Sequence, residues 1–120
     1  MIRIEQDGLE RLKHRLRKFA ADRDWDKFHS PKNLSMALIA EAAELVEHFQ
    51  WLSEEQSAQL PAEKLREVET ELADILVYLI RMADKLGVDL IAAAESKISI
   101  NEVKYPADKV RGSSRKYTEY

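Results

Sequence analysis

Apolar residues recur at helical spacing along most of the chain. In the first segment they lie three, four and three positions apart, at Leu9, Leu12, Leu16 and Phe19. This spacing places them on one face of a helix that frays near residues 21–23. Ser30 followed by Pro31 is typical of a helix start, with serine as the N-cap and proline as the first helical residue. The pattern predicts a second helix over 31–52.

Polar residues, proline and glycine divide the second half of the chain. The polar stretch 53–61 breaks the apolar pattern and is predicted to be a loop. Pro61 begins a third helix, which Gly87 ends because glycine readily adopts the left-handed conformation that follows a helix. Asp89 is the expected N-cap of a fourth helix that ends near Tyr105, where Pro106 disfavours continuation. Residues 106–120 are expected to form an irregular basic tail.

Four helices joined by short connections predict an all-α fold, an antiparallel four-helix bundle that forms one domain over residues 1–120. The third helix is apolar on most sides, because Asp74 and Arg81 are its only charged residues between Leu72 and Ala83. Such a helix needs more than one neighbour to cover it. A second subunit is the expected cover, and the sequence therefore predicts a homo-oligomer.

Composition supports this interpretation and narrows the function. The chain has 45% hydrophobic and 34% charged residues but only three Gly and three Pro, which suits long helices around one core. A net charge of −3 argues against a protein dedicated to polymeric nucleic acid. The absence of cysteine excludes disulfides and thiolate metal sites. Without a membrane-length apolar run or a signal-peptide pattern, we expect a cytoplasmic protein that does not enter a membrane.

Two acidic residues interrupt the apolar face of the second helix. Glu41 and Glu44 are the only charged residues between Leu34 and Val46. Their spacing of three places both on one side of the helix, about one turn apart. Buried ionised carboxylates are unfavourable unless they are paired or bound to a metal. We therefore expect another part of the chain to provide a partner for Glu41 and Glu44, or further ligands for a metal ion that offsets their charge.

The third helix repeats the same acidic pattern. Glu67, Glu71, Asp74 and Tyr78 follow one another at spacings of four, three and four. If the two helices pack antiparallel, Glu71 and Asp74 face the acids of the second helix, and like charges at short range require a cation. Oxygen ligands select hard cations, and Mg²⁺ is the expected one. One such acidic pair is commonly a solvated helix face, but two pairs in apolar segments predict a metal platform for a phosphorylated substrate.

The acidic residues admit two other interpretations. A di-iron carboxylate bundle needs Glu-x-x-His on two helices, whereas Glu44 is followed three residues later by Glu47, with His48 one position beyond. That alternative is weak. A non-catalytic helical module that uses the acidic stripes to bind a partner or to fix oligomer register is the alternative from another functional class.

Cationic and aromatic residues form a second group of candidates. Lys97, Asn101 and Lys104 share a face of the fourth helix, and the tail adds Lys109, Arg111, Arg115 and Lys116. Such donors suit a polyphosphate, although a solvated basic face is the more usual meaning of the pattern. The aromatic residues Trp25, Phe28, Phe49 and Trp51 either stack on a nucleobase or close the end of the bundle. In the first case His29 or Asn33 would read the base edge.

The acidic motifs carry a family resemblance. EAAE at 41–44 and ELAD at 71–74 resemble the ExxE…ExxD signature of the all-α nucleoside triphosphate pyrophosphohydrolases, the MazG-like superfamily. The segments FAADRDWDKFHSPKNL, EAAELVEHFQW, ELADILVYLI and SKISINEVKYPADKVRGSSRKYTEY are similar to its dCTP pyrophosphatase branch. In the vertebrate members, a histidine of the first helix stands where this chain has Leu16, and the loop between the acidic motifs is longer. Both departures leave the base preference open.

The resemblance implies Mg²⁺-dependent hydrolysis of dCTP, and of modified dCTP, to dCMP and pyrophosphate, which would remove these nucleotides from the pool. A broader activity on other triphosphates such as dUTP is the enzymatic alternative. The implied metal ligands and catalytic residues are Glu41, Glu44, Glu71 and Asp74. The implied substrate-binding residues are Trp25, His29, Trp51, Tyr78, Lys97, Asn101, Arg111, Arg115 and Lys116. Family members similar to this chain form tetramers, which implies a homotetramer.

Overall fold

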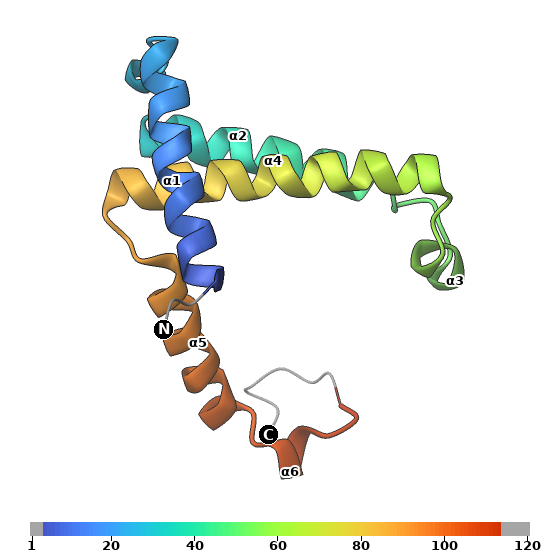
Figure 1. The fold of residues 1–120 in the computed structure, drawn as a ribbon. Helices are drawn as coiled ribbons and strands as arrows, with labels where there is room; N and C mark the ends of the chain where they lie inside the picture. Colours follow the sequence, from blue (N-terminus) through green and yellow to red (C-terminus); the bar gives the residue numbers. More distant parts are fainter. Residues whose placement is uncertain (1–3, 114–120) are drawn as a thin grey trace. The chain divides into compact units, whose positions relative to one another are not determined.

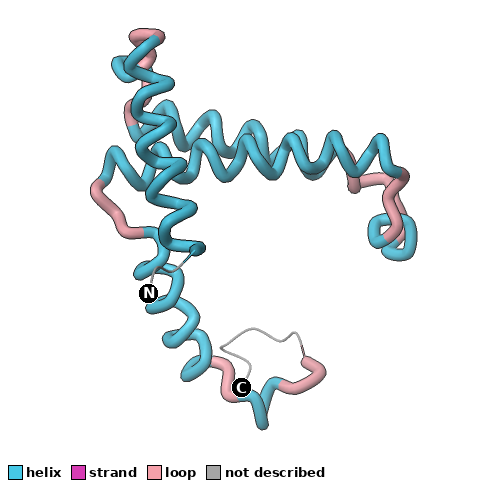
Figure 2. The backbone as a smooth tube through the Cα atoms, viewed as in Figure 1, coloured by secondary structure: helices cyan, strands magenta, loops and turns pink. Residues whose placement is uncertain are grey.

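The computed structural model describes residues 4–113, and within that range the chain forms helices and loops but no strand (Figure 2). The elements are α1 (Ile4–Asp22), the 3₁₀ turn η1 (Asp26–Phe28), α2 (Pro31–Glu47), α3 (Glu54–Ala58), α4 (Ala62–Leu86), α5 (Leu90–Lys104) and α6 (Ala107–Val110). The all-α prediction is confirmed. The chain divides into two units, Met1–Gly87 and Val88–Tyr120.

The predicted helix starts are present, with the expected capping contacts. The Ser30 side chain accepts a hydrogen bond from the backbone N–H of Asn33, and Pro31 is the first residue of α2. The Asp89 side chain accepts one from the backbone N–H of Ala92 at the start of α5. Gly87 ends α4 with φ +69°, a left-handed conformation that other residues rarely adopt.

The region 48–61 differs from the prediction. α2 ends at Glu47 rather than at residue 52, and the chain continues in tight turns in which the His48 N–H donates to the carbonyl of Leu45. The predicted loop 53–61 contains α3. Ser53 and Gln56 form a capping box there: the Ser53 hydroxyl accepts from the Gln56 N–H, and the Gln56 side chain accepts from the Ser53 N–H. This reciprocal cap starts a new helix because it satisfies two N–H groups at once.

In the first unit, α2 and α4 lie side by side and antiparallel, and α1 packs across α4 (Figure 1). The core at these contacts is small. Its buried apolar residues are Ala20, Leu34, Val68, Ile80 and Ala83. The pairing of the two long helices brings their middle turns together, which is what positions the acidic residues described below.

An ion pair fixes α1 to the end of α4. Arg17 donates from Nε and Nη2 to the two carboxylate oxygens of Asp84, at 2.7 and 2.6 Å. The hydrogen bond from Arg17 lowers the pKa of Asp84, and burial opposes that effect. Because two nitrogen atoms of Arg17 bind the two oxygen atoms of one carboxylate, the contact is bidentate, which adds a defined geometry to the attraction between the charges.

The second unit contains α5 and α6. α6 corrects the prediction that residues 106–120 are irregular, because Pro106 provides the N-terminal boundary of this short helix and restricts its first turn. The remainder of the predicted tail, residues 114–120, lies outside the described residues. None of the helices in residues 4–113 has the length and apolar content that crossing a membrane requires.

Candidate metal centre

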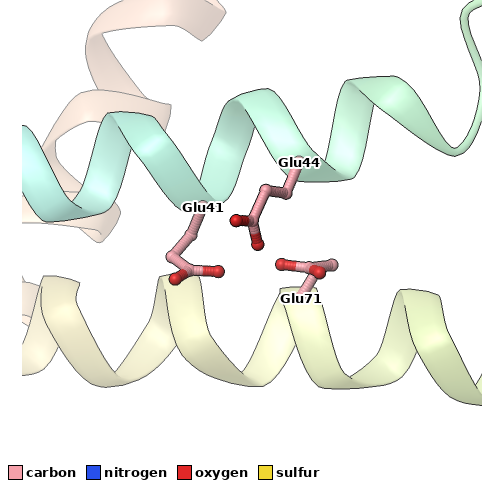
Figure 3. A group of neighbouring side chains, drawn as sticks. All are labelled: Glu41, Glu44 and Glu71. Carbon is pink, nitrogen blue, oxygen red and sulfur yellow. The ribbon is translucent and has the colours of Figure 1, made fainter.

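Three carboxylates from two helices meet between α2 and α4. Glu41 and Glu44 lie one turn apart on α2, and Glu71 faces them from α4 (Figure 3). One oxygen atom from each of the three lies within 4.8 Å of the other two. The spacing of three on α2 and the antiparallel direction of α4 are sufficient to produce this arrangement.

The cluster has more negative charge than its surroundings balance. Oε2 of Glu41 and Oε2 of Glu71 are buried and accept no hydrogen bond from any residue that the structure describes. The neighbouring Glu71 carboxyl group, followed by burial and by Glu44, raises the pKa of Glu41 to about 7. Like charges and partial burial both disfavour the ionised form. A bound cation would relieve this repulsion and give the unpartnered oxygen atoms a ligand.

The chemistry of the three side chains fits a hard divalent cation. The group offers oxygen atoms only, and such sets bind Mg²⁺, Mn²⁺ or Ca²⁺ in preference to softer metals. Asp74 lies one turn beyond Glu71 on α4 and is half-buried. It is not part of the group within 4.8 Å, but its charge also contributes to the raised pKa of Glu41.

His48 is a neighbour of the cluster that the sequence analysis did not select. Its Nε2 atom lies 3.8 Å from Oε1 of Glu71, and its Nδ1 atom lies 3.8 Å from Oε2 of Glu67. Lys64 Nζ approaches the same Nδ1 atom at 3.3 Å. The signal was available, because His48 follows Glu44 by four residues and therefore lies on the acidic side of α2.

A second group of candidate residues surrounds η1. Trp25 precedes this turn, stacks edge-on against Phe19 with ring centroids 5.7 Å apart, and is 45% exposed. His29 follows the turn and is half-buried, and Arg81 of α4 donates to its Nδ1 atom at 3.2 Å. The turn η1 is therefore preceded by an exposed indole, which can stack, and followed by a histidine that Arg81 holds through a hydrogen bond.

One chain does not bring Trp25 and Trp51 together. Trp25 lies before the start of α2, and Trp51 follows its end. Between them in the chain lie the 17 residues of α2, a helix about 25 Å long. Trp51 is 87% exposed, so the surroundings within its own chain cover very little of the ring. The two indoles therefore follow and precede opposite ends of α2.

The other predicted substrate-binding residues fall in several places. Tyr78 is half-buried on α4, one turn beyond Asp74. Lys97 and Asn101 lie one turn apart on α5, and Arg111 is exposed at the end of α6, so these three belong to the second unit. Arg115 and Lys116 lie outside the described residues.

Over residues 4–113, the chain is helical and gathers carboxylates from two antiparallel helices, an arrangement that helical metal-binding proteins also use. Comparison with known families identifies the family of this chain. The model of the MazG-like family matches residues 37–120, and the chain belongs to that family.

Individual relatives agree with this placement. The chain is 44% identical over 114 residues to dCTP pyrophosphatase 1 of Homo sapiens and 41% identical over 113 residues to that of Mus musculus. Each match covers 92% of this chain but only 66% of the relative, so the chain spans just under two thirds of their length. A crystal structure of a pyrophosphatase from Archaeoglobus fulgidus superposes with a TM-score of 0.78 at 40% identity, covering 82% of this chain and 93% of that one. The MazG-like fold predicted from the sequence is confirmed.

Proposed function

We propose that this protein is a metal-dependent nucleoside triphosphate pyrophosphohydrolase that cleaves dCTP, and modified dCTP, to the monophosphate and pyrophosphate. The observation that carries the proposal is the carboxylate cluster of Glu41, Glu44 and Glu71, with its buried unpartnered oxygen atoms. The identity of more than 40% to dCTP pyrophosphatases supports the choice of substrate. We propose that the whole chain acts as one such domain in the cytoplasm.

The proposed metal ligands are Glu41, Glu44, Glu71 and Asp74, and the proposed ion is Mg²⁺. When bound, Mg²⁺ supplies positive charge that offsets the charge on the phosphate oxygens and lowers the pKa of a coordinated water. The carboxylates orient the attacking water, and one of them accepts its proton. The water oxygen forms a bond to the α-phosphorus, and the bond from that phosphorus to the α–β bridging oxygen breaks, which releases pyrophosphate.

The proposed substrate contacts divide between base and phosphates. Trp25 and Trp51 stack on the base, and His29 donates to its edge. The remaining predicted residues contact the sugar and the phosphates, with the cations matching the charge of the triphosphate. They are Tyr78, Lys97, Asn101, Arg111, Arg115 and Lys116.

We also propose that the protein works as a homo-oligomer, a tetramer in the form that the family resemblance implies. One observation supports this. Leu72 and Leu76 of α4 are 52% and 40% exposed in the isolated chain, although a helix this apolar is normally covered. In this arrangement, the basic tail of one copy covers the site of another.

The experiment is a substrate panel with the purified chain and Mg²⁺. Products from dCTP, dUTP and the other triphosphates are separated by ion-exchange chromatography, which distinguishes pyrophosphate from single phosphate. We expect dCMP and pyrophosphate from dCTP, and a loss of about 10²-fold or more in kcat for Glu71→Gln. Glu47→Gln is the matched control, because Glu47 is exposed on α2 and lies outside the cluster. Release of single phosphate, or full activity in Glu71→Gln, contradicts the proposal.

A further inference from the structure

Arg81 is a buried cation in an otherwise apolar part of α4. Its side chain is 4% exposed, and it reaches η1 and the residue that follows it. Nε donates to Nδ1 of His29 at 3.2 Å, and Nη2 donates to Oδ1 of Asp26 at 2.9 Å. The metal centre uses neither contact, so the burial of this charge needs another explanation.

The contact with His29 determines where that ring carries its proton. A guanidinium group stays charged and only donates hydrogen bonds. The Nδ1 atom that faces it must therefore present a lone pair, and the neutral ring carries its proton on Nε2. A protonated ring would place an N–H group of His29 against the N–H group of Arg81, which is repulsive.

Other charges fix the head group of Arg81 in this position. Asp26 accepts from Arg81 and also pairs with Lys85 at 2.7 Å. On the other side, Asp84 lies 3.6 Å from Nη1 of Arg81 and is itself held by Arg17. Because the guanidinium group is planar and is held on two sides, it cannot turn away from His29 without breaking several contacts.

We propose that Arg81 is a positioning residue that locks His29 in the neutral Nε2–H form, so that His29 offers the nucleobase a hydrogen-bond donor and never an acceptor. The part that concerns the base rests on the proposed function. A fixed donor matches the N3 atom of cytosine, which accepts, and opposes the N3–H group of uracil, which donates. The pair thereby favours dCTP over dUTP where His29 faces that edge of the base.

The charges around His29 agree with a neutral ring. Burial lowers the pKa of His29 most, and the positive charge of Arg81 lowers it further. Asp26 acts in the opposite direction, and Lys85 adds a smaller lowering effect. The ring therefore stays neutral at a pH at which an exposed histidine is already partly protonated.

The first test measures the tautomer directly and does not depend on activity. Two-bond ¹H–¹⁵N NMR spectra of the full chain distinguish a ring protonated at Nε2 from one protonated at Nδ1. We expect only the Nε2–H form of His29 in the wild type at neutral pH. In Arg81→Met we expect a mixture of tautomers and a higher pKa for the ring. Lys18→Met is the control, because it removes an exposed ion pair of α1 with Asp22 that involves neither Arg81 nor His29.

A wild-type ring protonated at Nδ1, or a mixture, overturns the proposal, as does an unchanged tautomer in a folded Arg81→Met protein. Arg81→Lys is the second variant in case the methionine protein does not fold. It keeps the charge but lacks the paired donors, and we expect it to lose the single tautomer as well. If neither variant folds, a wild-type ring with any Nδ1–H form still overturns the proposal.

The second test measures selectivity. We expect Arg81→Met to raise KM for dCTP by about threefold to tenfold with little change in kcat, because one hydrogen bond to the base is lost. The ratio of kcat/KM for dCTP to that for dUTP should fall, whereas Lys18→Met should leave this ratio unchanged. An unchanged ratio of kcat/KM for the two nucleotides overturns the proposed contact with the base. The tautomer of His29 is then tested by the NMR spectra alone. If the wild type releases pyrophosphate from no triphosphate, the proposed function fails and the base contact fails with it, while the spectra still decide the tautomer.

Discussion

Removing one carboxylate from the acidic cluster should stabilise the metal-free protein. Glu71→Gln keeps the size of the side chain but removes one of three carboxylates whose oxygen atoms lie within 4.8 Å of one another. All three are charged only at a pH above the raised pKa of Glu41, so the unfolding is measured there. At that separation and an effective dielectric constant of 20, one pair of charges repels by about 3 kcal/mol. Solvent screening reduces this value, and we expect a net gain of about 1–2 kcal/mol. The same change should remove the response to Mg²⁺, because the cluster loses a ligand.

The assay is urea unfolding, with and without Mg²⁺, in chelator-treated buffer. We expect Glu71→Gln to unfold at higher urea than the wild type without metal. With Mg²⁺ at 100 times its Kd, the wild type should gain about 2.7 kcal/mol and the variant much less. Glu47→Gln removes an exposed charge from the same pair of helices and should change stability by less than about 0.5 kcal/mol. A destabilised, metal-responsive Glu71→Gln protein refutes the assignment of these residues to a metal site.

Two further predictions concern the ion pair at the end of α4 and the exposed face of that helix. Arg17→Met should lower the free energy of unfolding at neutral pH, measured by urea titration, because it removes the partner of the Asp84 carboxylate. Since Arg17 lowers the pKa of Asp84 in the folded state, this contribution is present above the pKa of an unfolded aspartate. The contribution disappears as the pH falls through the pKa of Asp84 in the folded protein. Equal differences in unfolding free energy between the wild type and Arg17→Met at pH 7 and pH 2 would therefore contradict this prediction. Leu76→Asp should shift the protein toward monomers in sedimentation velocity, and unchanged assembly would exclude that face from the interface.

The fold was predictable where short-range chemistry determines it. Ser30 and Asp89 cap helices through side-chain contacts with residues three positions away, and such contacts can be recognised in the sequence. The region 48–61 was predicted less well although its signal was also local. Ser53 and Gln56 have the spacing of a capping box, but the surrounding polar residues suggested a loop.

The candidate site shows the same division between local and distant information. Glu41 and Glu44 were predictable from their spacing on one helix, and Glu71 from the assumption that the next long helix runs antiparallel. The contact of His29 with Arg81 could not be predicted from the sequence. The two residues are 52 positions apart, and no periodic pattern connects a turn with the far end of α4. In the sequence, Arg81 was only a charge in an apolar segment.

The two charged residues in the apolar middle of α4 differ in what their burial achieves. Asp74 adds negative charge beside an acidic cluster and is the smallest of the causes that raise the pKa of Glu41, after Glu71, burial and Glu44. Arg81 is buried against partners that satisfy it. Glu71 of the cluster and Arg81, which contacts His29, lie on the same continuous helix. They are ten residues apart, which is about 15 Å along the helix axis. If the proposed function is correct, α4 fixes the distance between the metal and the base contact. Substitutions that bend this helix between Glu71 and Arg81 should then weaken substrate binding without touching either site.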